Sequence, residues 1–326
     1  SFLTATWHDG VHEVSVLTKP PAADFIDYLA VKKTVDNRAL NRAVWQRLKT
    51  CLPVTAPERP LRVIELGGGI GTMLERVMEW ELAAHLDYTL TDLDPAHVDA
   101  FRSRIVHWGE QEGRLLEHET GGAVRIRHPG GECLARAVTE DLTMTIERFG
   151  QMRQWDLLLA HALLDLVDVD EVLPGCCGLV RPGGLLYLSL IFNGTTEFLP
   201  PWQDGFEKEM LDRYHRSMDE RRFRGRPAGS SRAGSLVFRK LREIELPILA
   251  AGSSDWIVFG QKGGTPGIEA AFLKAIIETI RQELHRDSSL DQGRLTDWVD
   301  QRRSQAMSGE LAYLARNLDV LARVPF

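Results

Sequence analysis

The chain is predicted to have an α/β fold, in which helices cover both faces of a mostly parallel sheet. Short apolar runs that suit buried parallel strands recur at residues 61–66, 88–91, 155–160 and 185–192. Helical periodicity follows the first two runs, so strand and helix patterns alternate. The chain has 326 residues, of which 44% are hydrophobic and 26% charged, which allows one large domain with appendages or two domains.

The residues before the first strand predict an arm, two helices and a linker. Residues 1–20 are mixed in character and should be irregular or strand-like. Apolar residues then recur at helical spacing from Ala23 to about Leu48. Two prolines bound a linker at Pro53 to Pro60. We therefore treat residues 1–57 as a segment that precedes the core domain.

The most informative stretch is Val63 to Thr72, which reads VIELGGGIGT. It predicts a strand, a glycine turn and a helix, and glycines at such a turn let a ligand approach the backbone closely. The dinucleotide pattern G-x-G-x-x-G fails, because the sixth position counted from Gly67 is Thr72. Glu65 would repel a pyrophosphate and would suit a cationic ligand. The alternative is a glycine turn that binds nothing.

The second strand, at Tyr88 to Thr91, ends in Asp92. A carboxylate at the end of a second parallel strand can accept hydrogen bonds from both hydroxyls of a ribose. Asp94 fits the N-cap of the next helix, with Pro95 at its first position. The alternative is that both aspartates only cap this helix.

The third, fourth and fifth strands bring further polar residues to the same edge. Glycine pairs in residues 113–133 predict a hairpin inserted before the third strand, Leu134 to Val138. His161 ends the fourth strand, where it is a candidate general base or orients a ligand through its backbone. Asn193 follows the fifth strand and either contacts a substrate or stabilises its loop.

The remainder of the chain predicts helices around a closing hairpin. Residues 205–220 are amphipathic, and the arginine-rich segment 221–234 forms either a solvated loop or a lid over an anionic substrate. Two short strands, at 243–250 and 255–260, bring the strand count to seven. Residues 263–326 are predicted to be a helical extension, whose last helix is marked by Leu311, Leu314, Leu318 and Leu321.

Four features in this order resemble the class I S-adenosylmethionine-dependent methyltransferases over roughly residues 58–262. They are the acidic-x-G-x-G-x-G spacing that starts at Glu65, Asp92 after the second strand, the Glu-Asp-Leu sequence after the third, and LVRPGGLLYLSL at the fifth. The resemblance implies a Rossmann-like sheet of seven strands, with the helices of residues 1–57 as a cap over the cofactor. It implies S-adenosylmethionine as cofactor and S-adenosylhomocysteine as product.

The resemblance also implies roles for individual residues. Asp141 would accept a hydrogen bond from the adenine amino group, and Leu142 would pack on the ring. The cofactor-binding residues that it implies are Glu65, Gly67, Gly68, Gly69, Gly71, Asp92, Leu93, Asp141, Leu142 and His161. From their places in the chain, the candidates for contact with the substrate are Tyr28, Arg38, Asn193, Tyr214 and His215.

Composition limits the partners that we expect. The net charge of −7 and the isoelectric point of about 5.8 disfavour a nucleic-acid acceptor. No apolar run approaches the roughly 20 residues of a membrane span. The four cysteines form no C-x-x-C motif, and no metal-ligand spacing stands out, so we expect a cytoplasmic protein without a metal. The apolar tail suits packing on its own core or a homodimer contact.

The sequence therefore predicts methyl transfer from S-adenosylmethionine to a small molecule. Such a reaction depends on proximity and water exclusion, with His161 as a candidate base. One alternative is a non-catalytic subunit that binds S-adenosylmethionine and contacts partners through the tail. The other is a nucleotide-binding oxidoreductase, against which Glu65 and the failed dinucleotide pattern both argue.

Overall fold

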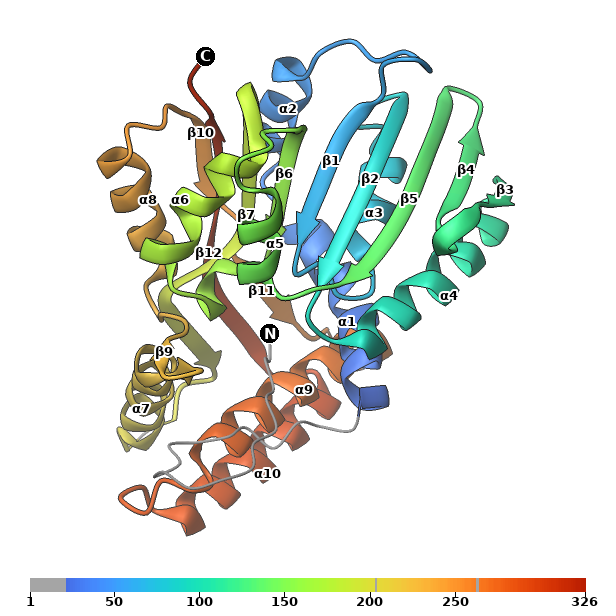
Figure 1. Ribbon diagram of the computed structural model, residues 1–326. Helices are drawn as coiled ribbons and strands as arrows, with labels where there is room; N and C mark the ends of the chain where they lie inside the picture. Colours follow the sequence, from blue (N-terminus) through green and yellow to red (C-terminus); the bar gives the residue numbers. More distant parts are fainter. Residues whose placement is uncertain (1–21, 203, 262–263) are drawn as a thin grey trace.

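A ten-stranded sheet forms the centre of the chain, and helices cover both of its faces (Figure 1). This computed structural model describes residues 22–202, 204–261 and 264–326. The strands of the sheet are β1 (Leu61–Leu66), β2 (His85–Asp92), β3 (Leu115–His118), β4 (Val124–His128), β5 (Gly131–Thr139), β6 (Trp155–His161), β7 (Val180–Leu199), β10 (Ile248–Ser253), β11 (Trp256–Phe259) and β12 (Ala312–Arg323). The predicted α/β fold is confirmed, and the predicted arm at residues 1–20 lies outside the described residues.

The strand order creates a natural ligand site. The order is β10-β12-β7-β6-β1-β2-β5-β4-β3, with β11 paired to β12. From β1 the chain builds outward through β2 to β5, then crosses back to β6 on the other side of β1, and all of these neighbours pair in parallel. In open α/β sheets, ligands bind beyond the carboxyl ends of the strands at such a switch point.

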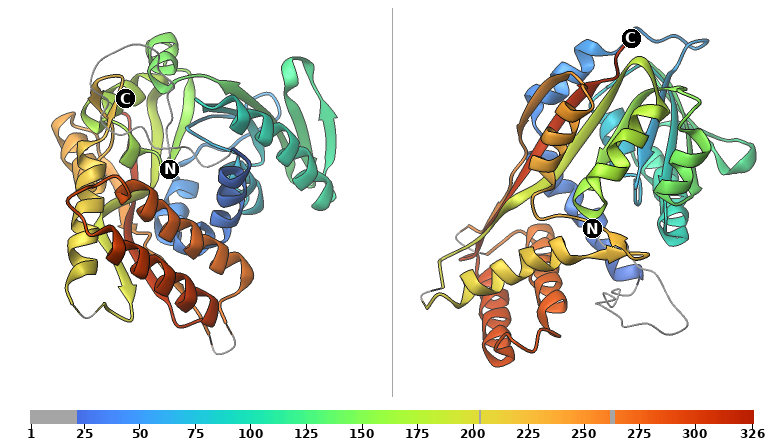
Figure 2. Two further views of the ribbon diagram at one scale, coloured as in Figure 1. Left: turned by 90° about the horizontal axis from the view of Figure 1, so that it is seen from below. Right: turned by 60° about the vertical axis from the view of Figure 1, so that its left-hand side comes forward.

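Helices pack on both faces and at one end of the sheet. They are α1 (Ala22–Ala39), α2 (Arg42–Cys51), α3 (Thr72–Glu79), α4 (Pro95–Gln111), α5 (Leu142–Phe149), α6 (Val169–Leu179), α7 (Phe206–Glu220), α8 (Ala233–Glu243), α9 (Gly267–Leu284) and α10 (Gln292–Ser308). The two views of Figure 2 show α7, α9 and α10 together at the end of the sheet toward which β1 and β2 run. The predicted helices at residues 23–48 and 205–220 are confirmed as α1, α2 and α7.

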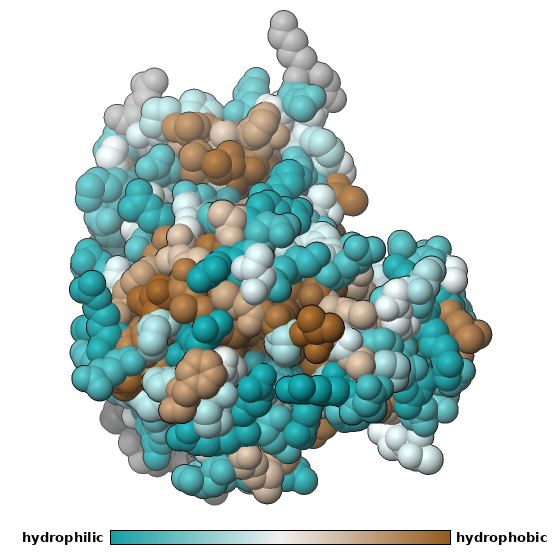
Figure 3. Space-filling view, turned by 90° about the horizontal axis from the view of Figure 1, so that it is seen from above, coloured by the Kyte–Doolittle hydropathy of each residue, from teal (hydrophilic) through white to brown (hydrophobic). Residues whose placement is uncertain are grey.

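The sheet has more strands than the seven predicted. The insertion at residues 113–133 forms the predicted hairpin, because β3 and β4 pair antiparallel beside β5. With α4 it makes the lobe at the right of Figure 3. The other added strand is β12. The two short strands near residue 250 were predicted to pair with each other, but β10 and β11 both pair with β12.

The prediction of a helix at the end of the chain is wrong. The leucines at 311, 314, 318 and 321 recur at helical spacing, yet residues 312–323 form β12, antiparallel between β7 and β10. Two register shifts in its pairing with β7 disturb the two-residue alternation of a strand. Both faces are covered as well, so apolar residues stand next to one another. Within the described residues 264–326, the extension is therefore helical only in α9 and α10, and its end belongs to the sheet.

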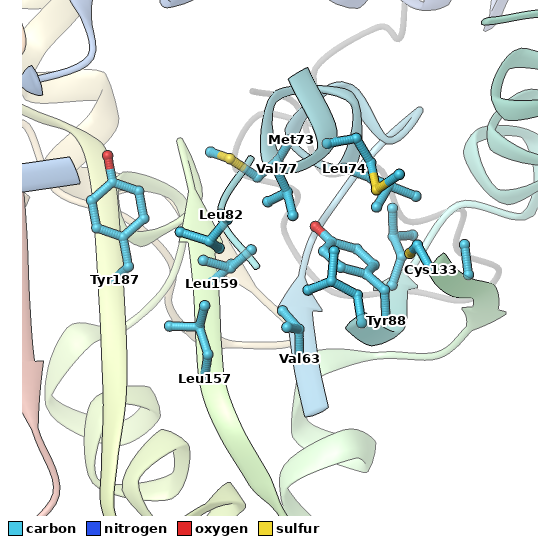
Figure 4. Close-up of a cluster of buried hydrophobic side chains, with 14 of the residues drawn as sticks. Val63, Met73, Leu74, Val77, Leu82, Tyr88, Cys133, Leu157, Leu159 and Tyr187 are labelled. Atoms are coloured by element: carbon cyan, nitrogen blue, oxygen red, sulfur yellow. The ribbon is translucent and has the colours of Figure 1, made fainter. Parts of the chain in front are cut away.

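The alternation along β6 divides the core in two. Leu157 and Leu159 face a cluster with α2, α3 and α4 (Figure 4), whereas Leu158 and Ala160 face a cluster with α6 and α8. A third cluster joins α7, α9 and α10 to the far end of β7 and contains Trp298. On α9, the apolar residues Phe272, Ile276, Ile280 and Leu284 are buried in this third cluster, whereas Ile268 at its start is exposed. Packing within the chain thus accounts for most of the apolar face of this helix.

Two further findings bear on the composition. None of the described helices is both long and apolar enough to cross a membrane. All four cysteines are unpaired, and Cys133 and Cys176 are buried while Cys51 and Cys177 are half-buried.

Candidate functional site

A cavity of about 590 Å³ lies at the carboxyl ends of the parallel strands, at the switch point of the sheet. Its walls come from the glycine loop after β1, the residues after β2, β5 and β6, helix α1 and the segment 223–228. Of the residues predicted to bind the cofactor, those that line it are Glu65, Gly67, Gly68, Gly69, Asp92, Leu93, Asp141, Leu142 and His161. One cavity therefore brings together residues that are nearly a hundred positions apart.

The glycine loop presents backbone rather than side chains to this cavity. Gly69 has φ +55°, a left-handed conformation that glycine adopts without strain, and the nearest atom to an added Cβ would be Leu29 Cδ1 at 3.3 Å. Gly71 has a different role. It starts α3 with φ +83°, and a Cβ there would lie 2.3 Å from the Phe101 ring, so its side of the loop packs against α4. Gly71 is not among the lining residues.

Asp92 ties the glycine loop to the end of β2. Its Oδ2 accepts a hydrogen bond of 2.8 Å from the Gly69 N–H, and its Oδ1 accepts one of 2.9 Å from the Asp94 N–H. His97 Nδ1 lies 3.0 Å from the same Oδ1. Asp94 accepts a hydrogen bond from the Ala96 N–H and caps α4, as predicted. The two aspartates therefore differ, because Asp92 faces the cavity and Asp94 stabilises the helix.

Glu65 is a buried carboxyl at the end of β1. Its side chain is 1% exposed and accepts a hydrogen bond of 2.6 Å from the Tyr88 hydroxyl. Burial raises the pKa of Glu65 to about 8, although the Tyr88 hydrogen bond and the Arg76 charge oppose this rise. A neutral Glu65 is thus held beside the glycine loop near pH 7, and a cation in the cavity would favour its ionised form.

A two-stranded hairpin covers one side of the cavity. It consists of β8 (Arg222–Phe223) and β9 (Arg226–Pro227), and it lies in the arginine-rich segment predicted to be a loop or a lid. Arg224 lies 3.5 Å from Asp141 Oδ2, and Arg226 pairs with Glu171 on α6. Asp141 also caps α5 through the Thr143 N–H. The hairpin therefore contacts the amino ends of both α5 and α6.

Sequence reasoning missed a buried polar network that joins α1 to the sheet. Asp36 Oδ2 accepts a hydrogen bond of 2.6 Å from Lys32 Nζ and lies 3.3 Å from Arg76 Nη2 and 3.1 Å from His161 Nε2. Asp36 and Arg76 are 1% and 0% exposed. Burial would raise the pKa of Asp36, but the Lys32, His161 and Arg76 contacts hold it below its usual range.

This network occupies both ring nitrogens of His161. Nδ1 lies 2.9 Å from the Ser189 hydroxyl, and Nε2 contacts Asp36 and Arg76. Burial and the Arg76 charge lower the pKa of His161 to about 3, so the ring is neutral at pH 7. This arrangement favours a positioning role over the general base named from the sequence. Lys32 and Asp36, four residues apart on one helix, were the only local signal of the network.

The predicted substrate residues separate into two groups. Tyr28 and Tyr214 line a second cavity of about 70 Å³, and His215 lies 3.0 Å from Thr196, which also lines it. Arg38 pairs instead with Glu269 and is half-exposed. Asn193 accepts hydrogen bonds of 3.0 Å from the backbone and hydroxyl of Ser235, which matches the loop-stabilising alternative. Neither Arg38 nor Asn193 lines either cavity.

The second cavity also involves the tail, for which the sequence suggested only packing on the core or a homodimer contact. Ile276, Thr279 and Glu283 of α9 line it, together with Tyr313 and Asn317 of β12. Among the described residues, no group of three or more His, Cys, Asp or Glu side chains is arranged to hold a metal ion.

Comparison with known proteins gives distant similarities. No family model and no curated protein matches the chain. Among solved structures, it is similar to a complex of the Haloferax volcanii Trm112 methyltransferase activator with a presumed methyltransferase, at 12% identity and a TM-score of 0.46, covering 94% of this chain and 96% of that one. It is also similar to geranyl diphosphate C-methyltransferase from Streptomyces coelicolor A3(2) with S-adenosyl-L-homocysteine, at 12% identity and a TM-score of 0.41, covering 86% and 79%.

A third similar structure is phosphoethanolamine N-methyltransferase 2 from Haemonchus contortus, also with S-adenosylhomocysteine, at 12% identity and a TM-score of 0.41, covering 86% of this chain and 52% of that one. These likenesses are too distant to assign an activity to this chain.

Proposed function

We propose that this chain is a class I S-adenosylmethionine-dependent methyltransferase that acts on a small molecule. The observation that carries the proposal is the convergence of the Gly69 backbone, Asp92 and Glu65 on one cavity at the switch point of the sheet. That cavity, of about 590 Å³, is within the size range of cofactor pockets.

The residues present fit such a cofactor. A Cβ at Gly69 would enter the space beside Leu29, so only glycine leaves that part of the loop open to a ligand. Asp92 would hold the ribose hydroxyls, and Asp141 with Leu142 would hold the adenine. Glu65 would face the cationic part, and the Lys32 ammonium would meet the carboxylate of the amino-acid part. Bound S-adenosylmethionine would supply an electrophilic methyl group on its sulfonium.

The protein's own contribution would be binding, orientation and exclusion of water. The hairpin that carries Arg224 and Arg226 would cover the cavity beside Asp141, where the adenine is proposed to bind, and α1 forms another part of the wall. The network of Asp36, Arg76 and His161 would fix α1 against β6 and keep that wall in place. Holding two reactants in register while excluding water is sufficient for methyl transfer without a covalent catalyst.

The remaining features of the proposal follow from charge and composition. An acidic chain suits a small acceptor better than a nucleic acid, and four unpaired cysteines suit a cytoplasmic location. A thermal-shift comparison tests the cofactor class, because S-adenosylmethionine should raise the melting temperature and NADH should not. Stabilisation by NADH alone would favour the oxidoreductase. Binding without turnover on a broad acceptor panel, together with a stable hetero-complex, would favour a regulatory subunit.

A further inference from the structure

The second cavity, of about 70 Å³, adjoins the proposed cofactor cavity. Tyr28, Ala162 and Leu166 line both cavities and mark the place where they meet. The smaller cavity lies between the carboxyl ends of β6 and β7 and the layer formed by α1, α7 and α9. If the larger cavity holds the methyl donor, as proposed above, this is where an acceptor would reach the methyl group.

Aromatic rings form much of the wall of this second cavity. They are Tyr28, Phe192, Tyr214, Trp256 and Tyr313, and they come from five different elements. Phe272 packs against three of these rings, and its ring centroid lies 6.1 Å from that of Tyr28, 5.4 Å from that of Trp256 and 6.2 Å from that of Tyr313. Burial raises the pKa of Tyr28, Tyr214 and Tyr313 above the usual value, so these rings stay neutral at pH 7. Neutral aromatic faces attract cations.

The charged side chains in the same wall include more acidic than basic groups. Asp165 and Glu283 line the cavity with a single guanidinium, that of Arg221. Asp165 Oδ1 is buried and has no hydrogen-bond partner among the described residues, and neither does Arg221 Nε. A buried carboxylate oxygen without a partner is destabilising, and an ammonium ligand would supply the missing donor. Lys32 is not among the residues that line this second cavity; it lines the larger one and pairs with Asp36.

We propose that this cavity binds the amino group of the acceptor and that the chain methylates a small aliphatic amine at nitrogen. The bound ammonium first gives one proton to water, and the lone pair of the resulting neutral amine forms the new N–C bond while the S–C bond breaks and its electron pair returns to sulfur. The positive charge thereby moves from the sulfonium to the methylated nitrogen, and the product leaves as an ammonium. Asp165, Glu283 and the aromatic rings surround the nitrogen on which that charge develops.

An alcohol acceptor fits the cavity less well. A hydroxyl must lose its proton to attack, and the ionisable groups that line this cavity are three tyrosines, two carboxyl groups and one arginine, with no histidine or lysine among them. His161, the histidine at the neighbouring strand end, has both ring nitrogens in contact with other side chains. An amine needs no base in the transfer step itself.

The test uses the full chain with saturating S-adenosylhomocysteine and methylammonium chloride as the probe. Melting temperatures are compared with those in sodium chloride and sodium acetate at equal ionic strength. Methylammonium should stabilise the wild type and Asp170→Asn, a control whose carboxylate lies on α6 outside both cavities and pairs with Arg239. Asp165→Asn and, separately, Glu283→Gln should weaken the apparent affinity at least tenfold, so the test survives if one variant fails to fold.

The other outcomes separate two failures. If S-adenosylhomocysteine binds but methylammonium stabilises nothing, or stabilises Asp165→Asn and Glu283→Gln as well as the wild type, the amine proposal is overturned while the methyltransferase proposal stands. Stabilisation by acetate that Arg221→Gln abolishes would overturn it in favour of an anionic acceptor. If S-adenosylhomocysteine does not bind, the proposed function fails and the amine proposal fails with it.

Discussion

Glu65→Gln should remove a large part of the pH dependence of stability. The substitution keeps the shape of the side chain and an oxygen that can accept the Tyr88 hydrogen bond, but it cannot ionise. Burial raises the pKa of Glu65 to about 8, against an ordinary value of 4.5. The folded state therefore keeps a proton that the unfolded state releases, so this contribution to stability is full below about pH 4.5 and is lost as the pH rises through about 8.

The size of this loss follows from the same pair of values. The difference between about 8 and 4.5, at about 1.36 kcal/mol for each pKa unit, corresponds to about 5 kcal/mol. Chemical denaturation at several pH values between 5 and 9 measures the free energy of unfolding for the wild type and for Glu65→Gln. As the pH rises across this range, the wild type should lose several kcal/mol of unfolding free energy relative to Glu65→Gln. Parallel curves of unfolding free energy against pH for the two proteins would refute the reasoning.

The same carboxyl links the proton to the proposed cofactor. A sulfonium or ammonium in the cavity favours ionised Glu65, so cofactor binding near pH 7 should release a proton. Calorimetry in buffers of different ionisation enthalpy counts this proton. Glu65→Gln should release fewer protons than the wild type by a sizeable fraction of one. Equal proton release from the two proteins would show that Glu65 does not sense the ligand.

Three further predictions use other parts of the structure. Asp92→Ala should weaken S-adenosylhomocysteine binding at least tenfold in calorimetry, because each charge-assisted hydrogen bond is worth about 1.5 to 3 kcal/mol. Asp94→Ala should mainly lower the stability of the helix that it caps. If Asp94→Ala weakened binding and Asp92→Ala did not, Asp94 would be the ribose ligand. Arg224→Ala should increase hydrogen exchange of the β8–β9 hairpin in the free protein, and unchanged exchange would show that the ion pair does not hold it. Glu207→Ala should lower the free energy of unfolding by about 3 to 5 kcal/mol, since it leaves the buried Arg302 guanidinium without its carboxylate. A loss under about 1 kcal/mol in chemical denaturation would contradict this.

The predictable parts of the fold are those set by neighbours in the chain. The glycine loop, the Asp94 cap and the inserted hairpin each depend on a few consecutive residues, and the structure contains all three. β12 could not be predicted, because its leucine spacing matches a helix and only its place between β7 and β10 makes it a strand. In that position tertiary context outweighs local pattern.

The candidate site divides in the same way. Asp92 and Glu65 stand at strand ends next to the glycine turn, so the sequence alone brings them together. The contact between Asp36 and His161 joins residues 125 positions apart, and Asp36 by itself resembles any charged residue on a helix. Residues of α1, α7, α9 and β12 together line the second cavity, and no local sequence pattern predicts that these elements lie side by side.

Calorimetry with S-adenosylhomocysteine on the wild type, Gly69→Val and Gly267→Val tests the central claim most directly. Valine at 69 would enter the space beside Leu29 where the loop faces the cavity, whereas a Cβ at Gly267, the first residue of α9, meets nothing within 4 Å and lies outside both cavities. The wild type and Gly267→Val should bind with equal affinity, and Gly69→Val should lose binding while its circular dichroism spectrum stays that of the wild type. Equal affinity for all three proteins would contradict the assignment of the cofactor to the glycine loop.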